Sequence, residues 1–445
     1  MNILRLTAKF FKKTTTVSAI SKSFILIANF ISSLFVVFNF SSIEQAYYYT
    51  IISLFLVQAF VELGFNSVVL HFVSHARKKI FIRKNLFMGN KEEIARLLSL
   101  SRFSLRWISI SAFILFIILI TVGLYIFSNN ENDFNIISLW IYLSIIFSMA
   151  FLIQPIYIFF DGLSLIREVC LLRLFQSFVL NVSFWILVMN MGGLWSILYA
   201  QIFSFISILF VIIYFFHPLL RKLFLPSIKP KKFDWRYEFL PMQWRIAISS
   251  LCGYFIFASY TPLTFKYIDE VLAGQVGITL SLMVGMRGLI GALINPYITK
   301  YGFLISRNKT KKLIHIVHKN ILMSAFFSAF IIASYYLLLI YLEEYYFDIY
   351  ERFLPNEISM YFFLGNFLIC ISLPISGFLR SFKEEPLFLL SVSSAIIIII
   401  ANIFSAYIGS IVIMGVTFLS VNILIIPLIF YKFSVKKKFV ESKKI

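Results

Sequence analysis

The sequence has few charged residues and very few acidic ones. Only 13% of its 445 residues are charged, with 20 Asp and Glu against 40 Lys and Arg, while 60% are hydrophobic. That composition is typical of a polytopic membrane protein. A net charge of +20 would suggest a nucleic-acid partner for a soluble protein. Here the basic residues flank apolar runs, as they do beside membrane spans, so no nucleic acid is expected.

Cysteine and the short motifs of soluble enzymes are also scarce. The three cysteines Cys170, Cys252 and Cys370 lie in apolar stretches without a pairing pattern, which predicts buried thiols. The chain has no phosphate-binding glycine loop and no HExxH motif, so neither nucleotide hydrolysis nor a cofactor is expected. His71 and His75 have the i, i+4 spacing of some metal sites, but no third ligand is near in sequence, so no metal is expected.

What the chain has in abundance is long apolar runs. Each is long enough to cross the hydrocarbon core of a bilayer as a helix, and an open sheet edge cannot exist in lipid. We therefore expect an all-α polytopic membrane protein with about twelve transmembrane helices. Their approximate ranges are 20–40, 47–72, 105–127, 136–160, 169–191, 194–216, 246–265, 272–297, 321–342, 358–378, 387–408 and 411–431.

The charges of the connecting loops predict orientation. Alternate connections are rich in Lys and Arg, above all 73–104 and 217–245, whereas the others carry half of the acidic residues and few basic ones. By the positive-inside rule we expect the basic connections and both termini to be cytoplasmic. The two long basic loops could contain short amphipathic helices that lie on anionic lipid.

The loop 217–245 also divides the chain. We expect an N-terminal six-helix lobe over 1–216, a cytoplasmic linker over 217–245, and a C-terminal six-helix lobe with a basic tail over 246–445. A weak internal repeat agrees with this division, since Glu44-Gln45-Ala46-Tyr47 opens the second span and Gly274-Gln275-Val276-Gly277 opens the eighth. Repeated halves are a recurring design in transporters.

Glu62 is a carboxylate near the middle of the second apolar run. Burial at that depth costs about 2.5–3.5 kcal/mol, so such a residue usually faces a lumen or a partner. Gln58 and Asn66 share its helical face at i−4 and i+4. This pattern predicts a helix that lines a water-filled path.

Arg287 is the second charge at depth, and Asn295 lies two helical turns further along the same face. Gly285, Gly288 and Gly291 remove bulk around it. Two interpretations are open: the glycines let helices approach closely, or they leave room for a ligand beside the guanidinium.

Three further features have alternative readings. Glu62 and Arg287 lie at similar depth in corresponding spans, so they could neutralise each other as a charge pair or gate. Lys22 and Arg245 begin the first and seventh spans, either as snorkelling anchors or as a basic ring that attracts an anionic head group. The tyrosines 47–49 fit an aromatic belt at the outer interface or a surface on which sugar rings stack.

Two stretches resemble a known family. The run Glu44-Gln45-Ala46-Tyr47-Tyr48-Tyr49-Thr50, followed by Gln58 and by Phe60-Val61-Glu62-Leu63-Gly64, is similar to Wzx-type polysaccharide flippases, as is Gly274-Gln275-Val276-Gly277-Ile278-Thr279-Leu280. These flippases, which serve O-antigen or capsule synthesis, belong to the multidrug/oligosaccharidyl-lipid/polysaccharide exporter (MOP) superfamily. Ala46 departs from a glycine that is common in the family.

The resemblance implies two six-helix lobes that form a V around a central cavity, as in MATE transporters. It implies alternating access that moves an oligosaccharide linked to a polyprenyl diphosphate, namely undecaprenyl diphosphate, to the outer leaflet. The product would serve the synthesis of lipopolysaccharide or another surface polysaccharide. Membrane lipid, a polysaccharide polymerase and a chain-length regulator are the expected partners. The residues available for the diphosphate and the sugars are Arg287, Lys22, Arg245, Gln58, Asn66 and Asn295.

Two other functions remain open. A cation-coupled drug or metabolite antiporter of the same fold would need an acidic cluster in the cavity, whereas Glu62 is the only clear intramembrane carboxylate. A membrane glycosyltransferase or polysaccharide polymerase would need a sizeable outer loop, whereas the loop around 343–357 is short and acidic.

Overall fold

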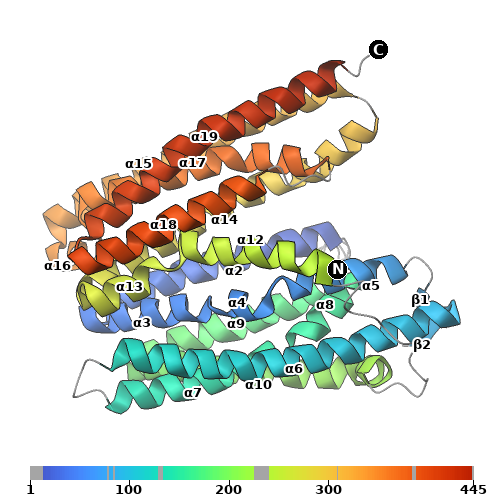
Figure 1. The fold of residues 1–445 in the computed structure, drawn as a ribbon. Coiled ribbons are helices and arrows are strands. Elements are labelled where there is room, and N and C mark those ends of the chain that lie inside the picture. Colours follow the sequence, from blue (N-terminus) through green and yellow to red (C-terminus); the bar gives the residue numbers. More distant parts are fainter. Residues whose placement is uncertain are drawn as a thin grey trace, which may run out of the picture. The chain divides into compact units, whose positions relative to one another are not determined.

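A computed structural model describes residues 14–77, 80–83, 86–128, 134–224, 240–307, 309–382 and 387–442. Nearly all of these residues are helical, and the only sheet among them is a two-stranded hairpin (Figure 1). The all-α prediction is therefore confirmed.

The chain forms two compact units. The first unit contains Met1–Phe35 and Leu54–Leu251, and the second contains Val36–Ser53 and Cys252–Ile445. The second unit thus takes in residues 36–53, which the predicted N-terminal lobe included. The lobe boundaries proposed from sequence stay a prediction, and each unit is described below by itself.

The first half of the chain supplies most of the first unit. Its elements are α2 (Thr14–Asn39), α3 (Ser42–Phe55), α4 (Gln58–Glu62), α5 (Phe65–Ala76), β1 (Ile80–Arg83), β2 (Leu86–Gly89), α6 (Lys91–Phe127), α7 (Phe134–Phe151), α8 (Gln154–Gly162), α9 (Ile166–Met191) and α10 (Trp195–Phe224). The end of α2 and most of α3 lie in the second unit.

The second half begins with α12 (Leu240–Phe257), whose last residues enter the second unit. The elements that follow are α13 (Tyr260–Tyr267), α14 (Glu270–Ser306), α15 (Thr310–Tyr345), α16 (Phe347–Tyr350), α17 (Asn356–Arg380), α18 (Phe388–Ile408) and α19 (Ile411–Ser442).

Fewer spans are found than the twelve predicted. Within the described ranges, ten helices are long and apolar enough to cross a membrane, or eleven if a bent pair counts as one span. That pair is Ser42–Glu62 with Phe65–Ala76, at 53° to each other. The predicted seventh span corresponds to α12, which is not among the ten; polar Gln243 and Arg245 interrupt its apolar sequence.

The predicted loop 73–104 is largely ordered. Helix α5 continues to Ala76, the antiparallel hairpin β1–β2 follows, and α6 already begins at Lys91. Asn90 caps α6, because its side-chain oxygen accepts hydrogen bonds from the backbone N–H groups of Glu92 (2.9 Å) and Glu93 (3.4 Å). The two acidic residues also suit the positive end of the helix dipole. Of the loop 217–245, residues 225–239 lie outside the described residues.

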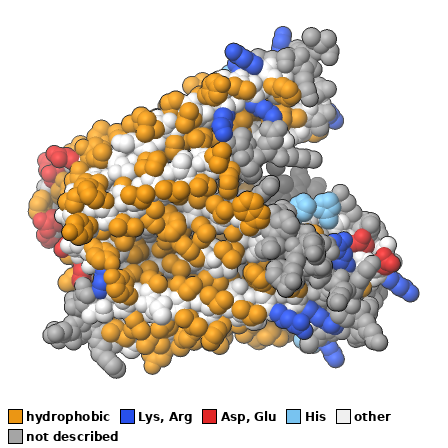
Figure 2. Space-filling view, viewed as in Figure 1, with side chains coloured by type: hydrophobic (Ala, Val, Ile, Leu, Met, Phe, Trp, Pro, Cys, Tyr) orange, Lys and Arg blue, Asp and Glu red, His pale blue; other side chains and the backbone are white. Residues whose placement is uncertain are grey.

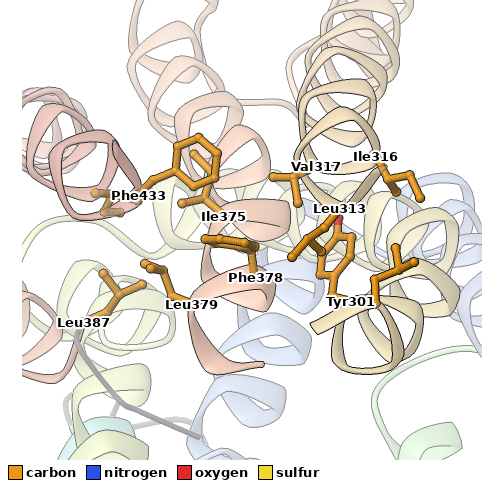
Figure 3. Packing of buried hydrophobic residues seen from close by; sticks show 11 residues of the cluster. Tyr301, Leu313, Ile316, Val317, Ile375, Phe378, Leu379, Leu387 and Phe433 are labelled. Atoms are coloured by element: carbon orange, nitrogen blue, oxygen red, sulfur yellow. The ribbon is translucent and has the colours of Figure 1, made fainter. Parts of the chain in front are cut away.

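Each unit has an aromatic and aliphatic core at the end where its basic residues gather. In the second unit, α14, α15, α17 and α19 pack around Tyr301, Val317, Phe378 and Phe433 (Figure 3). In the first, Tyr157 and Phe160 of α8 pack against residues of α9 and α10. In both units these apolar side chains hold neighbouring helices together.

Charge is distributed along the helices of the second unit as the loop analysis anticipated. Helix α15 has Lys311 and Lys312 near its start and Glu343 and Glu344 near its end, while the antiparallel α17 runs from Glu357 to Arg380. Figure 2 shows hydrophobic side chains over the long sides of the helices, with the acidic side chains of this unit near α16. Such a surface suits a membrane-embedded helical bundle.

Candidate functional site

The two sequence motifs of the resemblance contact each other in the second unit. The Gln45 side-chain amide of α3 donates hydrogen bonds to the backbone oxygens of Gly274 (3.2 Å) and Arg352 (3.0 Å). Arg352 in turn donates to the backbone oxygen of Phe40. Gln275 donates to the backbone oxygen of Glu351 at 2.8 Å. Both glutamines therefore fasten helix ends together.

Glycine makes this contact possible. A Cβ on Gly274 would lie 2.9 Å from the backbone nitrogen of Ala46, and one on Gly277 would lie 2.1 Å from the Cβ of Tyr49. Small residues at these positions let α3 and α14 approach closely. The motif is thus a packing surface between the two helices.

The start of α3 is fixed by a capping box. Glu44 accepts a hydrogen bond from the backbone N–H of Ser41 (2.8 Å), and the Ser41 hydroxyl accepts one from the backbone N–H of Glu44 (3.1 Å). The following tyrosines are buried: Tyr47, Tyr48 and Tyr49 are 3%, 9% and 4% exposed. Both interpretations of these tyrosines, an aromatic belt and a sugar-stacking surface, are therefore wrong, because the rings pack inside the second unit.

Arg287 lies near the middle of the 37-residue helix α14. Its guanidinium donates a 2.7 Å hydrogen bond to the side-chain oxygen of Asn366 on α17, and it lies over the Phe257 ring at 4.2 Å. Asn366 is fully buried and its amide group faces the backbone oxygen of Met283 and the sulfur of Met286. Neighbours without charge thus hold the guanidinium.

Arg287 keeps its charge without an acidic partner. Among the residues that the structure describes, no carboxylate forms an ion pair with it. The other nearby polar groups are the Cys370 thiol, one turn from Asn366, and the hydroxyl of Tyr260. Because a single acceptor uses one of five N–H donors, the guanidinium can bind an anion.

The glycines around Arg287 differ from those at the start of α14. A Cβ on Gly285 would meet no atom within 4 Å, and one on Gly291 would meet only the Asn295 amide nitrogen at 3.8 Å. Close helix packing does not explain these two glycines. Gly291 lies one turn from Arg287 on the same helical face, whereas Gly285 at i−2 lies on another face, so only Gly291 removes bulk beside the guanidinium. Asn295 itself is exposed.

Glu62 lies in the first unit, at a break that the periodicity did not predict. Leu63 and Gly64 both have positive φ (46° and 66°), so α4 ends at Glu62 and a new helix starts at Phe65. The expected continuous helix over 47–72 is therefore interrupted, and a second interruption lies between α3 and α4. Gly64 suits its backbone conformation because it has no Cβ.

The predicted polar trio nevertheless comes together at this break. The side chains of Gln58 and Asn66 both act on the Glu62 carboxylate and favour its charged form. The side-chain oxygen of Asn66 is buried and has no hydrogen-bond partner. Glu62 and Arg287 belong to different units, so their pairing stays a prediction, as do the roles of all these residues as substrate ligands.

A polar group that the sequence reading missed lies near the basic end of the first unit. Asp161 at the end of α8 is 3.6 Å from the guanidinium of Arg173 on α9, which lies over the ring of Tyr157. Lys22 of α2 is exposed, and its charge acts on Asp161. Only the i, i+4 spacing of Tyr157 and Asp161 could have indicated it.

Arg245, the histidine pair and the cysteines are the other residues that the sequence singles out. The side chain of Arg245 lies outside the described residues. His71 and His75 have ring centroids 4.7 Å apart, and no group of three or more metal-ligating side chains occurs within the described ranges. The three cysteines are free thiols, of which Cys252 and Cys370 are buried.

No family model and no curated protein matches the chain. Solved structures do match. An inward-facing multidrug resistance MATE family transporter of the MOP superfamily gives a TM-score of 0.63 at 13% identity, covering 96% of this chain and 100% of its own. The lipid II flippase MurJ, in an inward closed conformation, gives 0.66 at 14% identity, covering 94% and 88%.

A third structure, the MATE multidrug transporter DinF-BH in a complex, gives a TM-score of 0.55 at 14% identity, with 95% of each chain covered. Such low identities show the fold and no more. The predicted fold class is thereby confirmed: the chain has the fold shared by the MATE transporters of the MOP superfamily and by MurJ.

Proposed function

We propose that this chain is a flippase that moves an undecaprenyl-diphosphate-linked oligosaccharide from the cytoplasmic to the outer leaflet of the inner membrane by alternating access. The product would serve the synthesis of a surface polysaccharide such as O-antigen or capsule. In this proposal a polysaccharide polymerase and a chain-length regulator act on the flipped molecule.

One observation carries the proposal. Arg287 is an arginine at membrane depth whose surroundings are a neutral acceptor, an aromatic ring and Gly291, which adds no side chain one turn along the same helical face. A charge in the bilayer is costly and normally has a functional reason. A diphosphate offers paired oxygens that a guanidinium can bind in a bidentate manner, and it would compensate the unpaired charge.

Other residues would serve the rest of the substrate. Gln58 and Asn66 in the first unit and Asn295 in the second have amides suited to sugar hydroxyl groups. Lys22 and Arg245 would attract the diphosphate near the cytoplasmic mouth. The fold supports transport of a lipid-linked molecule, since a lipid flippase and multidrug transporters share it.

The test is transport by the purified protein in proteoliposomes that contain a fluorescent undecaprenyl-diphosphate oligosaccharide. A membrane-impermeant quencher added outside measures the fraction that has crossed. Arg287→Ala should reduce the flipping rate about a hundredfold, as expected when a buried charged partner is removed. Arg287→Lys should recover only part of the rate, because the bidentate geometry is lost.

Arg307 offers a matched control. Its guanidinium lies over the Phe303 ring at 4.2 Å, the same distance that separates Arg287 from Phe257, but it is exposed near the end of α14. Arg307→Ala should flip at the wild-type rate. A wild-type rate in Arg287→Ala would refute the role of Arg287, and failure of the wild-type protein to flip this lipid would refute the proposed function.

A cation-coupled antiporter is the second candidate, and the Glu62 group favours it. A carboxylate beside a buried Asn66 oxygen without a partner could bind a proton or a cation. Transport of a small cationic dye driven by an imposed ion gradient, without flipping of the lipid, would support this function instead.

A further inference from the structure

The polar group near the basic end of the first unit is not explained by packing alone. Three helices contribute to it: α2 supplies Lys22, α8 supplies Tyr157 and Asp161, and α9 supplies Arg173. The Ser21 hydroxyl donates to the backbone oxygen of Cys170 at 3.0 Å, which fixes α2 against α9 at this level.

The two cations of this group, Arg173 and Lys22, have hydrogen-bond donors that can still bind a ligand. The Arg173 side chain is half exposed, and its distance of 3.6 Å to Asp161 exceeds that of a direct hydrogen bond. Among the residues that the structure describes, neither Arg173 nor Lys22 donates a hydrogen bond. Two cations face one carboxylate, so the group has an excess of positive charge.

The neighbouring residues orient Arg173. Its guanidinium lies 5.4 Å from the centroid of the Tyr157 ring. The Tyr157 hydroxyl donates to the side-chain oxygen of Gln176 at 2.8 Å, which fixes the ring under the guanidinium. The donors of the group are therefore a guanidinium from α9 and an ammonium from α2.

We propose that Lys22 and Arg173 form a second phosphate-binding site, in which a phosphate group of a membrane lipid displaces Asp161 from Arg173. Asp161 competes with the ligand for the guanidinium. It pairs with Arg173 when the site is empty, and the phosphate replaces it when the ligand binds. In its strongest form, where the ligand is the diphosphate of the transported lipid, the inference rests on the proposed function.

The experiment measures binding and needs no transport. Radiolabelled undecaprenyl diphosphate is titrated against the full-length protein in nanodiscs of neutral phosphatidylcholine. Arg173→Gln and Lys22→Gln should each weaken binding about tenfold, the usual effect of losing a hydrogen bond to a charged group. Asp161→Asn should tighten binding, because the competing carboxylate is gone. Arg307→Gln is the matched control and should bind as the wild type does.

The opposite signs distinguish a ligand site from a structural ion pair. If the pair only held helices together, Arg173→Gln and Asp161→Asn would lower the melting temperature together and neither would tighten binding; that result overturns the inference. Wild-type affinity in both Arg173→Gln and Lys22→Gln also overturns it.

A second arm identifies the source of the phosphate. Nanodiscs with added phosphatidylglycerol should weaken the binding of undecaprenyl diphosphate to the wild type if phospholipid head groups occupy the site, and Arg173→Gln should remove that competition. No competition assigns the site to the diphosphate. Arg287→Ala in the same assay separates the two proposals: loss of binding there with normal Arg173→Gln supports the proposed function and refutes this second site.

Discussion

The start and the middle of α14 use glycine in opposite ways. At the start of the helix, a Cβ on Gly277 would overlap the Tyr49 side chain at 2.1 Å, so the missing side chain is filled by α3. About four turns further on, a Cβ on Gly291 would meet only the Asn295 amide nitrogen, at 3.8 Å. Glycine thus closes a helix contact at the start of α14 and leaves the face beside Arg287 open further along.

The polar residues at the start and in the middle of α14 differ in the same way. Gln45 and Gln275 bind backbone oxygens and hold helix ends in place. Arg287 has a side-chain acceptor and an aromatic ring, with donors left over. We infer that the start of α14 is structural and that its middle, around Arg287, is where substitutions affect transport most directly.

The largest expected effect separates the two glycines. Gly277→Leu should prevent stable folding or lower the melting temperature strongly, because overpacking a close contact costs about 1–3 kcal/mol even for small additions. Gly291→Leu should melt close to the wild-type temperature yet flip lipid slowly, because its side chain would lie beside Arg287 on the same helical face. Thermal melts in detergent and the flipping assay measure both. Equal melting temperatures for the two variants would break the comparison.

Asn366→Asp tests whether transport needs the uncompensated charge of Arg287. A carboxylate at the position of the Asn366 oxygen, 2.7 Å from the guanidinium, would neutralise Arg287. Flipping should fall about tenfold or more while the protein remains folded, since the new ion pair satisfies both buried groups. Asn320→Asp is a control at another fully buried asparagine of the second unit. Normal flipping by Asn366→Asp would show that the charge of Arg287 is not needed.

Gln45→Leu should have a moderate effect on stability alone. It removes two hydrogen bonds to backbone oxygens, each of which contributes about 0.5–1.5 kcal/mol. The melting temperature should fall, and flipping per folded molecule should stay at the wild-type level. A selective loss of flipping would mean that the contact between α3 and the start of α14 also takes part in transport.

The smallest effect is expected at Glu62 in the first unit. Glu62→Gln keeps the size of the side chain and can form hydrogen bonds with Gln58 and Asn66, so stability should be unchanged. If Glu62 and Arg287 pair in one state of the transport cycle, the variant should bind substrate normally and flip it a few times more slowly. Labelling of single cysteines in the two access states would detect the shift; unchanged labelling would exclude the gate.

The sequence alone determined the class of the protein. Long apolar runs can cross a bilayer only as helices, so composition and run length were enough to predict an all-α membrane protein. The cost of a charge in lipid identified Glu62 and Arg287, and helical spacing grouped Gln58 and Asn66 with Glu62. The family resemblance, not periodicity, supplied the transporter fold.

Only the tertiary structure decided what these residues contact. Spacing along one helix says nothing of the helix that packs against it, so Asn366 and Phe257 beside Arg287 could not be predicted, nor could the group formed by Lys22, Asp161 and Arg173. The burial of Tyr47 to Tyr49 followed from α3 joining the second unit across a long sequence separation. The break after Glu62 depends on left-handed backbone at Leu63 as well as at Gly64, and leucine adopts that conformation only where the surrounding fold imposes it.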